Sequence, residues 1–326
     1  MTFHVMIIPT LGCQCNCKYC WGSESTKEIM DISVIDDIIT WLKDFRDDKV
    51  HFTFHGGEPL LAGYDFYAQA LEKLSKIDNV EGFSLQSNIW LLSDELIDLF
   101  LKYNVVVSTS IDGPEEINDY QRAEGYFEKT MSRYEKAKEK GLNINFVLTV
   151  TQYSKDYSDE LYDFFKSNGM NLKIHAALPS LRGDNADPWA LDQEEHGKLL
   201  IDWLDKYLYD LDKFSVMDLD HIAKSTFRRR GTLCTFADCI GTTLAVGADG
   251  SIYPCYRFVG MDEYILGNVK ENPSFDKLKE SDAWTKLQEF REYVDENCAK
   301  CRYVKYCEGG CPYNACLLYT SPSPRD

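Results

Sequence analysis

The sequence predicts an α/β fold, in which a partial (β/α)6 TIM-like barrel is followed by a small cysteine-rich domain. Short runs of β-branched and aromatic residues alternate, strand first, with longer segments of helical period over about the first 210 of the 326 residues. The cysteines form two groups, four at 13–20 and eight after residue 216. An open doubly wound sheet shows the same periodicity, but six consecutive βα repeats favour the partial barrel.

Six strands and six helices are expected in the barrel, in alternating order. The strands are predicted where β-branched and aromatic residues cluster, at residues 3–8, 51–54, 83–86, 105–110, 143–149 and 172–176. The helices are predicted from their apolar periodicity, at residues 33–45, 64–74, 93–101, 126–140, 158–167 and 192–211. After about residue 216 the pattern changes to turns and short strands.

These changes of pattern predict three segments. We expect a barrel domain over residues 1–215 and a metal-rich domain over residues 216–315. The tail at 316–326 switches abruptly to Ser and Pro after an acidic, aromatic-rich region. We expect this tail to be non-native sequence or the mark of a shortened chain.

The charge balance and the N-terminus restrict the partners and the compartment. There are 53 acidic and 35 basic residues, giving a net charge of −18, which argues against a nucleic-acid or membrane-surface partner. The N-terminus lacks the basic segment of a signal peptide, and no uncharged apolar stretch approaches the length of about 18 residues needed to span a membrane. We therefore expect a cytoplasmic protein with reduced thiols, in which metal explains the cysteines better than disulfides do.

The first cysteine group, "GCQCNCKYC", directly follows the first predicted strand. Barrels of this kind carry their chemistry at the C-terminal ends of the strands, so this loop presents its thiols at the functional face. The spacing Cys13-x3-Cys17-x2-Cys20 can wrap three sulfurs around one [4Fe-4S] cube and leave the fourth iron without a protein ligand. A zinc site or a disulfide pair is the alternative. Cys15, one residue from each neighbour, is expected to point away from the face shared by the other three and to be a spectator.

This loop resembles the CxxxCxxC signature of the radical S-adenosylmethionine (radical SAM) enzymes, which follows the first strand of a partial barrel. The resemblance implies a [4Fe-4S] cluster whose open iron chelates the amino and carboxylate groups of SAM. It also implies an electron donor such as flavodoxin or ferredoxin, reductive cleavage of SAM to a 5′-deoxyadenosyl radical, and abstraction of a substrate hydrogen by that radical.

The second strand ends in "FHGGEPLLAG", where two glycines permit a bend and a close approach of the backbone to a ligand. Glu58 could accept a hydrogen bond from an ammonium group. In the resembled family this segment, here Gly56, Gly57 and Glu58, holds the methionine amino group of SAM. His55, just before it, is expected to be a structural histidine.

Further polar side chains follow the third and fourth predicted strands, in "SLQSN" and "VVVSTSIDGP". Residues of these types also cap helices and form turns, so each has a structural alternative. The resemblance implies that side chains here surround the ribose and methionine of SAM, with an arginine downstream. Tyr19, beside the last cysteine of the loop, could pack on the adenine or could equally belong to the core. The candidates at these strand ends and around them are Gln86, Asn88, Ser110, Asp112, Arg122 and Tyr19.

The second cysteine group contains a predicted hairpin, "GADGSIYPC", with its turn at Asp249-Gly250, and the string "CAKCRYVKYCEGGC". Zinc could take four cysteines at such spacings. Together the two segments resemble the SPASM domain of radical SAM enzymes that modify peptides and proteins, which binds two auxiliary [4Fe-4S] clusters. By motif, the ligands of the first cluster would be Cys234, Cys239, Cys255 and Cys311, and those of the second would begin with Cys298, Cys301 and Cys307.

Two departures from the family pattern concern the second auxiliary cluster and the substrate. The family's fourth ligand to that cluster normally lies well beyond Cys311, but here only Cys316 remains, so the cluster is expected to be incomplete if the chain is shortened. In the layout most similar to this one, that of the anaerobic sulfatase-maturating enzymes, an Asp follows the hairpin cysteine and acts as a base. Tyr256 takes this position here, and a phenol with a pKa of about 10 is a poor base at neutral pH.

The second departure, Tyr256, favours an enzyme that matures a ribosomally made peptide. Tyr256 is the one candidate for a catalytic side chain. The competing enzyme hypothesis is a sulfatase maturase that forms formylglycine. A competitor from another class is a zinc-stabilised binding protein without turnover.

Overall fold

The computed structural model describes residues 2–20, 28–45, 48–179 and 188–317. Its strands form one nine-stranded sheet in the order β6-β5-β4-β3-β2-β1-β7-β8-β9. The first six strands pair side by side in parallel, each with its neighbour in the chain. They are β1 (Thr2–Thr10), β2 (Lys49–Gly56), β3 (Val80–Gln86), β4 (Val106–Ser110), β5 (Ile144–Val150) and β6 (Leu172–Ala176). The six predicted strands and the open, partial barrel are therefore confirmed.

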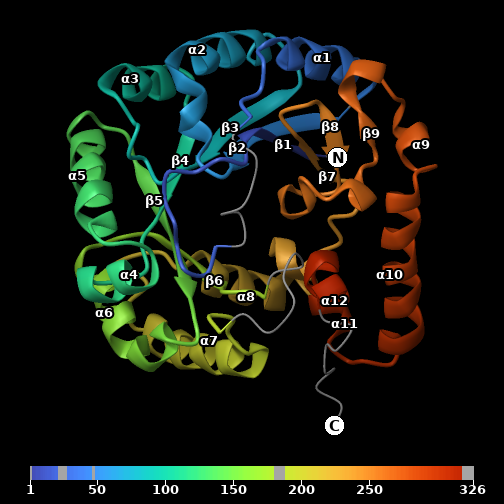
Figure 1. Ribbon diagram of the computed structural model, residues 1–326. Coiled ribbons are helices and arrows are strands. Elements are labelled where there is room, and N and C mark those ends of the chain that lie inside the picture. The colour runs from blue at the N-terminus through green and yellow to red at the C-terminus, as the bar shows by residue number, and fades with distance from the viewer. Residues whose placement is uncertain (1, 21–27, 46–47, 180–187, 318–326) are drawn as a thin grey trace.

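Seven helices alternate with these strands and lie around the outside of the curved sheet (Figure 1). They are α1 (Ser33–Trp41), α2 (Gly63–Leu74), α3 (Asp94–Lys102), α4 (Glu115–Gln121), α5 (Tyr126–Glu139), α6 (Ser158–Ser167) and α7 (Gln193–Tyr207). Each predicted helix is present, whereas α4 was not expected. In the described part of the chain, no helix has both the length and the hydropathy required to cross a bilayer.

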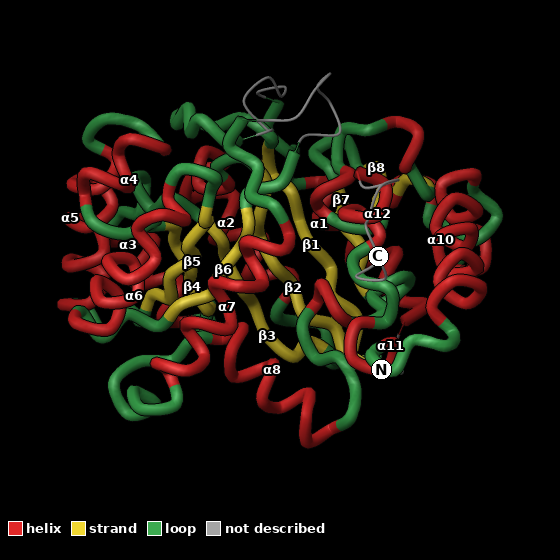
Figure 2. Tube along the Cα trace, turned by 90° about the horizontal axis from the view of Figure 1, so that it is seen from below, coloured by secondary structure: helices red, strands yellow, loops and turns green. Residues whose placement is uncertain are grey.

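The region after residue 216 is more helical than the sequence suggested. It contains α8 (Met217–Arg228), α9 (Phe275–Leu278), α10 (Asp282–Cys298), α11 (Val304–Cys307) and α12 (Pro312–Leu317). The expectation of only turns and short strands is wrong for α8 and α10. Figures 1 and 2 both place α10 at the opposite end of the molecule from α5.

The second region continues the barrel's own sheet. Its strands are β7 (Thr243–Val246), β8 (Ser251–Tyr253) and β9 (Gly267–Asn268). β7 pairs in parallel with β1, and β8 returns antiparallel through the predicted hairpin, where Gly250 has a φ of +90°. Trp41 of α1 donates a hydrogen bond through Nε1 to the carbonyl of Pro273, and Leu244 and Val246 pack in the same hydrophobic core as α1. The two predicted domains thus share a sheet and a core.

The two faces of the barrel sheet differ in polarity. Alternate residues on the outer face, such as Phe52 of β2 and Ile174 of β6, are buried in the two large cores against the helices. Their neighbours on the concave face, such as His55, Lys173 and His175, are only half-buried. The concave face is therefore not filled by layers of apolar side chains, as the interior of a closed TIM barrel is.

Candidate active site

The cysteine loop begins at the C-terminal end of β1 and rests on the glycines that end β2. The Gly57 N–H donates to the carbonyl of Thr10 at 3.0 Å, and the Glu58 N–H donates to that of Gly12 at 2.8 Å. A Cβ on Gly57 would lie 2.3 Å from the Gly12 carbonyl oxygen, and Gly56 has a φ of +127°. The close approach that the glycines permit in this structure is thus to the backbone of the cysteine loop.

The four thiols of this loop differ in environment. Cys13, Cys15 and Cys17 are half-buried, and Cys20 is exposed. A hydrogen bond with the Cys15 thiol lowers the pKa of Cys13, and the same contact raises the pKa of Cys15. Burial raises the pKa of Cys17 to about 11, although the Arg122 charge opposes this. The structure places Cys15 against Cys13 rather than pointing away from it, and its spectator role stays a prediction.

The donor set of this loop fits an iron–sulfur cube better than a single ion. Among the described residues, no three His, Cys, Asp or Glu side chains are disposed to hold one metal ion. A [4Fe-4S] cube takes each thiolate on a different iron, so its ligand sulfurs lie farther apart than the ligands of one zinc ion do. Cys13, Cys17 and Cys20 supply three soft donors on one short loop, as such a cube requires.

Glu58 joins the ends of two neighbouring strands. Its side chain is fully buried, and Oε1 accepts from the Leu60 N–H at 2.9 Å and the Ser87 hydroxyl at 2.7 Å. Oε2 accepts from the Asn88 N–H at 2.8 Å. Burial raises the pKa of Glu58 to about 7, against the effect of these three donors. The carboxylate is therefore engaged by the protein itself, and its predicted contact with an ammonium group stays a prediction.

Asp112 and Arg122 form a buried, two-pronged ion pair beneath the cysteine loop. Arg122 Nε lies 2.8 Å from Oδ2 of Asp112, and Nη2 donates to Oδ1 at 2.8 Å. Asp112 also accepts from the Tyr19 hydroxyl at 2.7 Å and the Thr149 N–H at 2.9 Å. Arg122 Nη1 lies 3.8 Å from the sulfur of Cys17. Two predicted cofactor residues, Tyr19 and Arg122, are therefore brought together by Asp112.

The three remaining polar candidates lie at two places. Asn88 lies against the cysteine loop, where its Nδ2 donates to the Cys15 sulfur at 3.2 Å and its Oδ1 accepts from Gln14 at 3.3 Å. Gln86 and Ser110 bond to each other across β3 and β4 at 3.0 Å. Gln14 was not a sequence candidate. Its position inside the cysteine loop was the available signal.

The predicted ligands of the first auxiliary cluster converge in the structure. They are Cys234, Cys239, Cys255 and Cys311. A hydrogen bond with the Cys239 thiol lowers the pKa of Cys234 to about 6, and the charges of Cys234, Cys255 and Cys311 all raise the pKa of Cys239. Burial raises the pKa of Cys255 to about 12. Four thiols from separate segments thus meet at one site, which suits a cluster.

Two of the predicted ligands of the second auxiliary cluster lie at the ends of helices, and the third lies between those helices. Cys298 is the last residue of α10, Cys307 is the last residue of α11, and the Cys301 N–H donates to the Cys298 carbonyl at 2.8 Å. Cys316 falls within α12, but its side chain is outside the part of the chain that the structure describes. The fourth ligand therefore stays a prediction, and so does most of the expected tail, since 318–326 are not described.

Tyr256 lies between the barrel and the second region. Its ring stacks on His55 of β2, with centroids 4.1 Å apart and planes at 26°. Arg257 Nε donates to the Tyr256 hydroxyl at 3.4 Å, and Nη1 donates to Oδ1 of Asn314 at 2.8 Å. Burial raises the pKa of Tyr256 and lowers that of His55 to about 4. Both side chains are therefore neutral at pH 7. The Tyr256 phenol loses its proton less readily than the phenol of a free tyrosine, so less of it is present as the phenolate that could act as a base.

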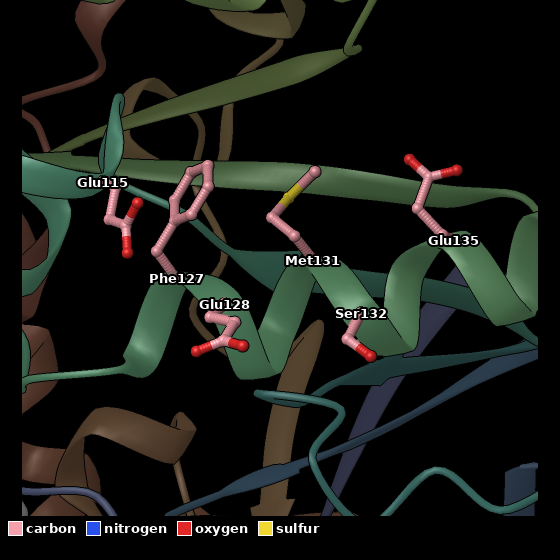
Figure 3. A pocket seen from close by; sticks show the side chains of 6 residues that line it. All are labelled: Glu115, Phe127, Glu128, Met131, Ser132 and Glu135. Atoms are coloured by element: carbon pink, nitrogen blue, oxygen red, sulfur yellow. The ribbon is translucent and has the colours of Figure 1, made fainter.

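Two hollows in the described part of the chain lie away from the predicted SAM site. One, of about 520 Å³, is on the outer helices, and none of the predicted site residues lines it. Figure 3 shows five of its side chains along α5 and Glu115 from α4. The other, of about 430 Å³, lies beside the first auxiliary site and includes Cys239 and Arg291 in its lining. The predicted SAM site is thus defined by converging strand ends and not by either hollow.

Comparison with known proteins agrees with this arrangement. Residues 7–165 match the radical SAM superfamily, and residues 234–302 match an iron-sulfur cluster-binding domain, SPASM. An uncharacterized protein of Methanothermobacter thermautotrophicus is 46% identical over 233 residues, which cover 71% of this chain and 89% of that protein. A cysteine-type anaerobic sulfatase-maturating enzyme of Clostridium perfringens is 26% identical, over 92% of this chain and 86% of the enzyme.

A solved structure shares the fold over almost the whole chain. It is native anSMEcpe with bound AdoMet and Cp18Cys peptide, which superimposes with a TM-score of 0.83 at 24% identity and covers 95% of this chain and 89% of its own. The matched regions hold the cysteine loop after β1 and the cysteine-rich second region. The chain belongs to the radical SAM superfamily and is an enzyme of the branch that carries a SPASM iron–sulfur domain.

Proposed function

We propose that this enzyme reductively cleaves SAM and uses the resulting 5′-deoxyadenosyl radical to abstract a hydrogen from a peptide, as a maturase of ribosomally made peptides. The proposal assigns Cys13, Cys17 and Cys20 to the cluster that supplies the electron to SAM. An external donor such as flavodoxin or ferredoxin would reduce that cluster. The four converging cysteines of the second region would hold one auxiliary cluster, and Cys298, Cys301 and Cys307 would begin the other.

The roles proposed for the chain's own residues near SAM follow from their contacts. Glu58 fixes the end of β2 to the end of β3, while Gly56 and Gly57 support the cysteine loop. Arg122, held by Asp112 beside Cys17, would provide a fixed positive charge close to the cluster. Tyr19, Gln86, Asn88 and Ser110 are proposed to complete the cofactor site.

The observation that favours a peptide maturase over a sulfatase maturase is the environment of Tyr256. A sulfatase-type reaction needs a proton acceptor at this position, and the resembled enzymes have an aspartate there. Tyr256 is stacked on a neutral histidine, and burial raises its pKa further above neutrality. A carboxylate-like base is therefore missing from this position.

Sulfatase maturation remains the second candidate, because curated relatives of this chain include sulfatase-maturating enzymes of the cysteine and serine types. Anaerobically reconstituted protein, reductant and SAM test both functions. We expect 5′-deoxyadenosine to form, and we expect a synthetic sulfatase peptide carrying Cys or Ser to remain without an aldehyde by mass spectrometry. Formylglycine in that peptide would establish the second candidate instead, and failure to form 5′-deoxyadenosine would exclude both.

A further inference from the structure

A basic surface lies around the predicted ligands of the second auxiliary cluster. The chain has 53 acidic and 35 basic residues, but no Asp or Glu lies between Asp220 and Asp238 or between Glu296 and Glu308. Both of these segments contain clustered Lys and Arg. The side chains that define the basic surface are all exposed, and they are Arg228, Arg229, Arg230, Lys300, Arg302 and Lys305.

The fold brings the two segments together. The Gly231 N–H donates to the carbonyl of Lys305 at 3.1 Å. The backbones approach so closely here that a Cβ on Gly231 would lie 2.7 Å from the carbonyl oxygen of Tyr306. Gly231 directly follows the three arginines, and Lys305 follows Arg302 in the same short turn and helix. Cations from distant parts of the sequence therefore share one surface.

The cations of the basic surface face solvent and aromatic rings. In the described part of the chain, the ion pairs between side chains are made by other Lys and Arg residues. Arg302 and Lys305 lie over the rings of Tyr303 and Tyr306, at 4.6 Å and 4.8 Å from the ring centroids. Their positive charge is therefore not neutralised within the described chain.

The acids that flank the two segments do not offset this charge. Asp238 is already in an ion pair, and its N–H donates to the Glu308 carboxylate. Asp220 accepts hydrogen bonds from two hydroxyl groups. Asp295 and Glu296 are exposed at the end of α10, but the six cations outnumber them.

The composition of the basic surface fits an acidic protein partner. Phe227 and Tyr303, which lie among the cations, are 88% and 53% exposed. Large aromatic rings and Arg are enriched where proteins bind one another. The whole chain has a net charge of −18, so most of its remaining surface repels an acidic protein. Charge complementarity would therefore direct such a partner to this place.

The cysteines among these cations favour an electron carrier over the peptide substrate. The predicted cluster ligands Cys298, Cys301 and Cys307 lie in the same segment as three of the cations. A carrier bound here would hold its redox group close to these thiols. A peptide substrate must instead touch the predicted SAM site for hydrogen abstraction, and none of the residues predicted for that site belongs to the basic surface.

We infer that the basic surface docks an acidic electron-carrier protein of the flavodoxin or ferredoxin kind. This inference rests on the proposed function, which requires an external electron donor. Complexes of electron carriers have small, weak interfaces, so a compact group of six cations with exposed rings is sufficient. Because the attraction is between exposed charges, the complex should be sensitive to salt.

The test measures binding of a purified acidic flavodoxin, with its FMN, to the reconstituted full-length enzyme by anaerobic biolayer interferometry. We expect the Kd to rise roughly tenfold between about 50 mM and about 300 mM KCl, since salt screens exposed charges. No binding at the lower salt concentration, or a complex that is insensitive to salt, would overturn the inference.

Arg228→Gln/Arg230→Gln should raise the Kd at low salt at least about fivefold, because it removes two exposed ion pairs with the carrier. Lys300→Gln/Lys305→Gln removes two cations from the other segment and should weaken binding similarly. The matched control is Lys136→Gln/Lys138→Gln, two exposed lysines of α5, which lies at the opposite end of the molecule from α10. Circular dichroism checks that each variant is folded.

Equal loss of binding in the control and in both test variants would contradict a local docking surface. A Glu-rich peptide that binds through these cations while flavodoxin does not would assign the surface to an acidic peptide instead. A dimer that light scattering shows only in the wild type would assign it to a second copy of the chain.

Formation of 5′-deoxyadenosine with dithionite as the reductant tests the proposed function without the carrier. This reaction should be unchanged in Arg228→Gln/Arg230→Gln, because neither arginine belongs to the predicted SAM site. Failure of the wild type with dithionite would count against the proposed function, whereas loss of flavodoxin binding alone would count against the docking surface.

Discussion

Asp112 is the residue on which the geometry of the predicted SAM site depends most directly. It is fully buried and holds Arg122, Tyr19 and the Thr149 N–H together. The sequence placed Asp112 at the active face and predicted roles for Arg122 and Tyr19, but it could not show that they share one carboxylate. That pairing depends on a contact between β4, the segment after α4 and the cysteine loop, which no local pattern encodes.

Asp112→Asn should therefore destabilise the protein, because it leaves the Arg122 guanidinium buried without its counter-charge. We expect the free energy of unfolding of the cluster-free protein to fall by about 3–5 kcal/mol, measured by urea denaturation. The matched control is Asp36→Asn, which breaks a solvent-exposed pair with Lys73 and should change stability little. Equal losses in the two variants would contradict a structural role for the buried pair.

Cys15 offers a second test at the scale of single residues. Cys13→Ala, Cys17→Ala and Cys20→Ala should each abolish SAM cleavage, since each removes a proposed cluster ligand. Cys15→Ala should retain most of it, although the structure places this thiol against Cys13. The readouts are visible absorbance of the cluster and 5′-deoxyadenosine by chromatography. Loss of both in Cys15→Ala would show that this thiol is a ligand as well.

Among the helices and strands, the sequence predicted those that bury one whole face in a hydrophobic core. The six barrel strands and the predicted helices gave clear periodicity because they pack into the two large cores. α10 has only Ala283 and Leu287 buried along its 17 residues, and α8 has only Asp218 and Leu219. The weak amphipathic pattern of α10 explains why this helix was not predicted, whereas α8 is as amphipathic as α1 and was missed despite its pattern.

The contact between the end of β2 and the cysteine loop gives a prediction for an element boundary. Gly57→Ala would place a methyl group against the Gly12 carbonyl, so we expect the loop to shift and SAM cleavage to fall at least about tenfold. Gly197→Ala is the control, because a Cβ there meets nothing within 4 Å. That substitution lies inside α7 and should raise stability by about 0.5–1 kcal/mol.

Both glycine variants should be compared for iron content, SAM cleavage and thermal unfolding. The expected result separates the two sites, with activity lost only at Gly57. Full SAM cleavage by Gly57→Ala would show that the loop position does not depend on this contact.

Several half-buried histidines make the stability of the whole molecule sensitive to acid. Burial lowers the pKa of His196 to about 4, below the value of 6.5 of an exposed imidazole, so the unfolded chain takes up its proton first. The neutral His196 side chain thus makes its full contribution to the free energy of unfolding above pH 6.5, and this contribution is lost as the pH falls toward 4. Urea denaturation at intervals between these two pH values should show that the free energy of unfolding falls. In His196→Gln this fall should be smaller by up to about 3 kcal/mol. Parallel curves for the wild type and the variant would contradict this assignment.

The domain boundary proposed near residue 215 separates two functions but not two independent folds. β7 covers the edge of β1, and Leu244 and Val246 complete the core formed with α1 and β2. In a chain of residues 1–215 alone, β1 would become an exposed edge strand, and part of that core would face solvent. We expect it to aggregate, whereas residues 1–315 should remain soluble with the circular dichroism of the full chain. A soluble, cooperatively unfolding 1–215 fragment would show that the barrel does not need the second region to complete its sheet.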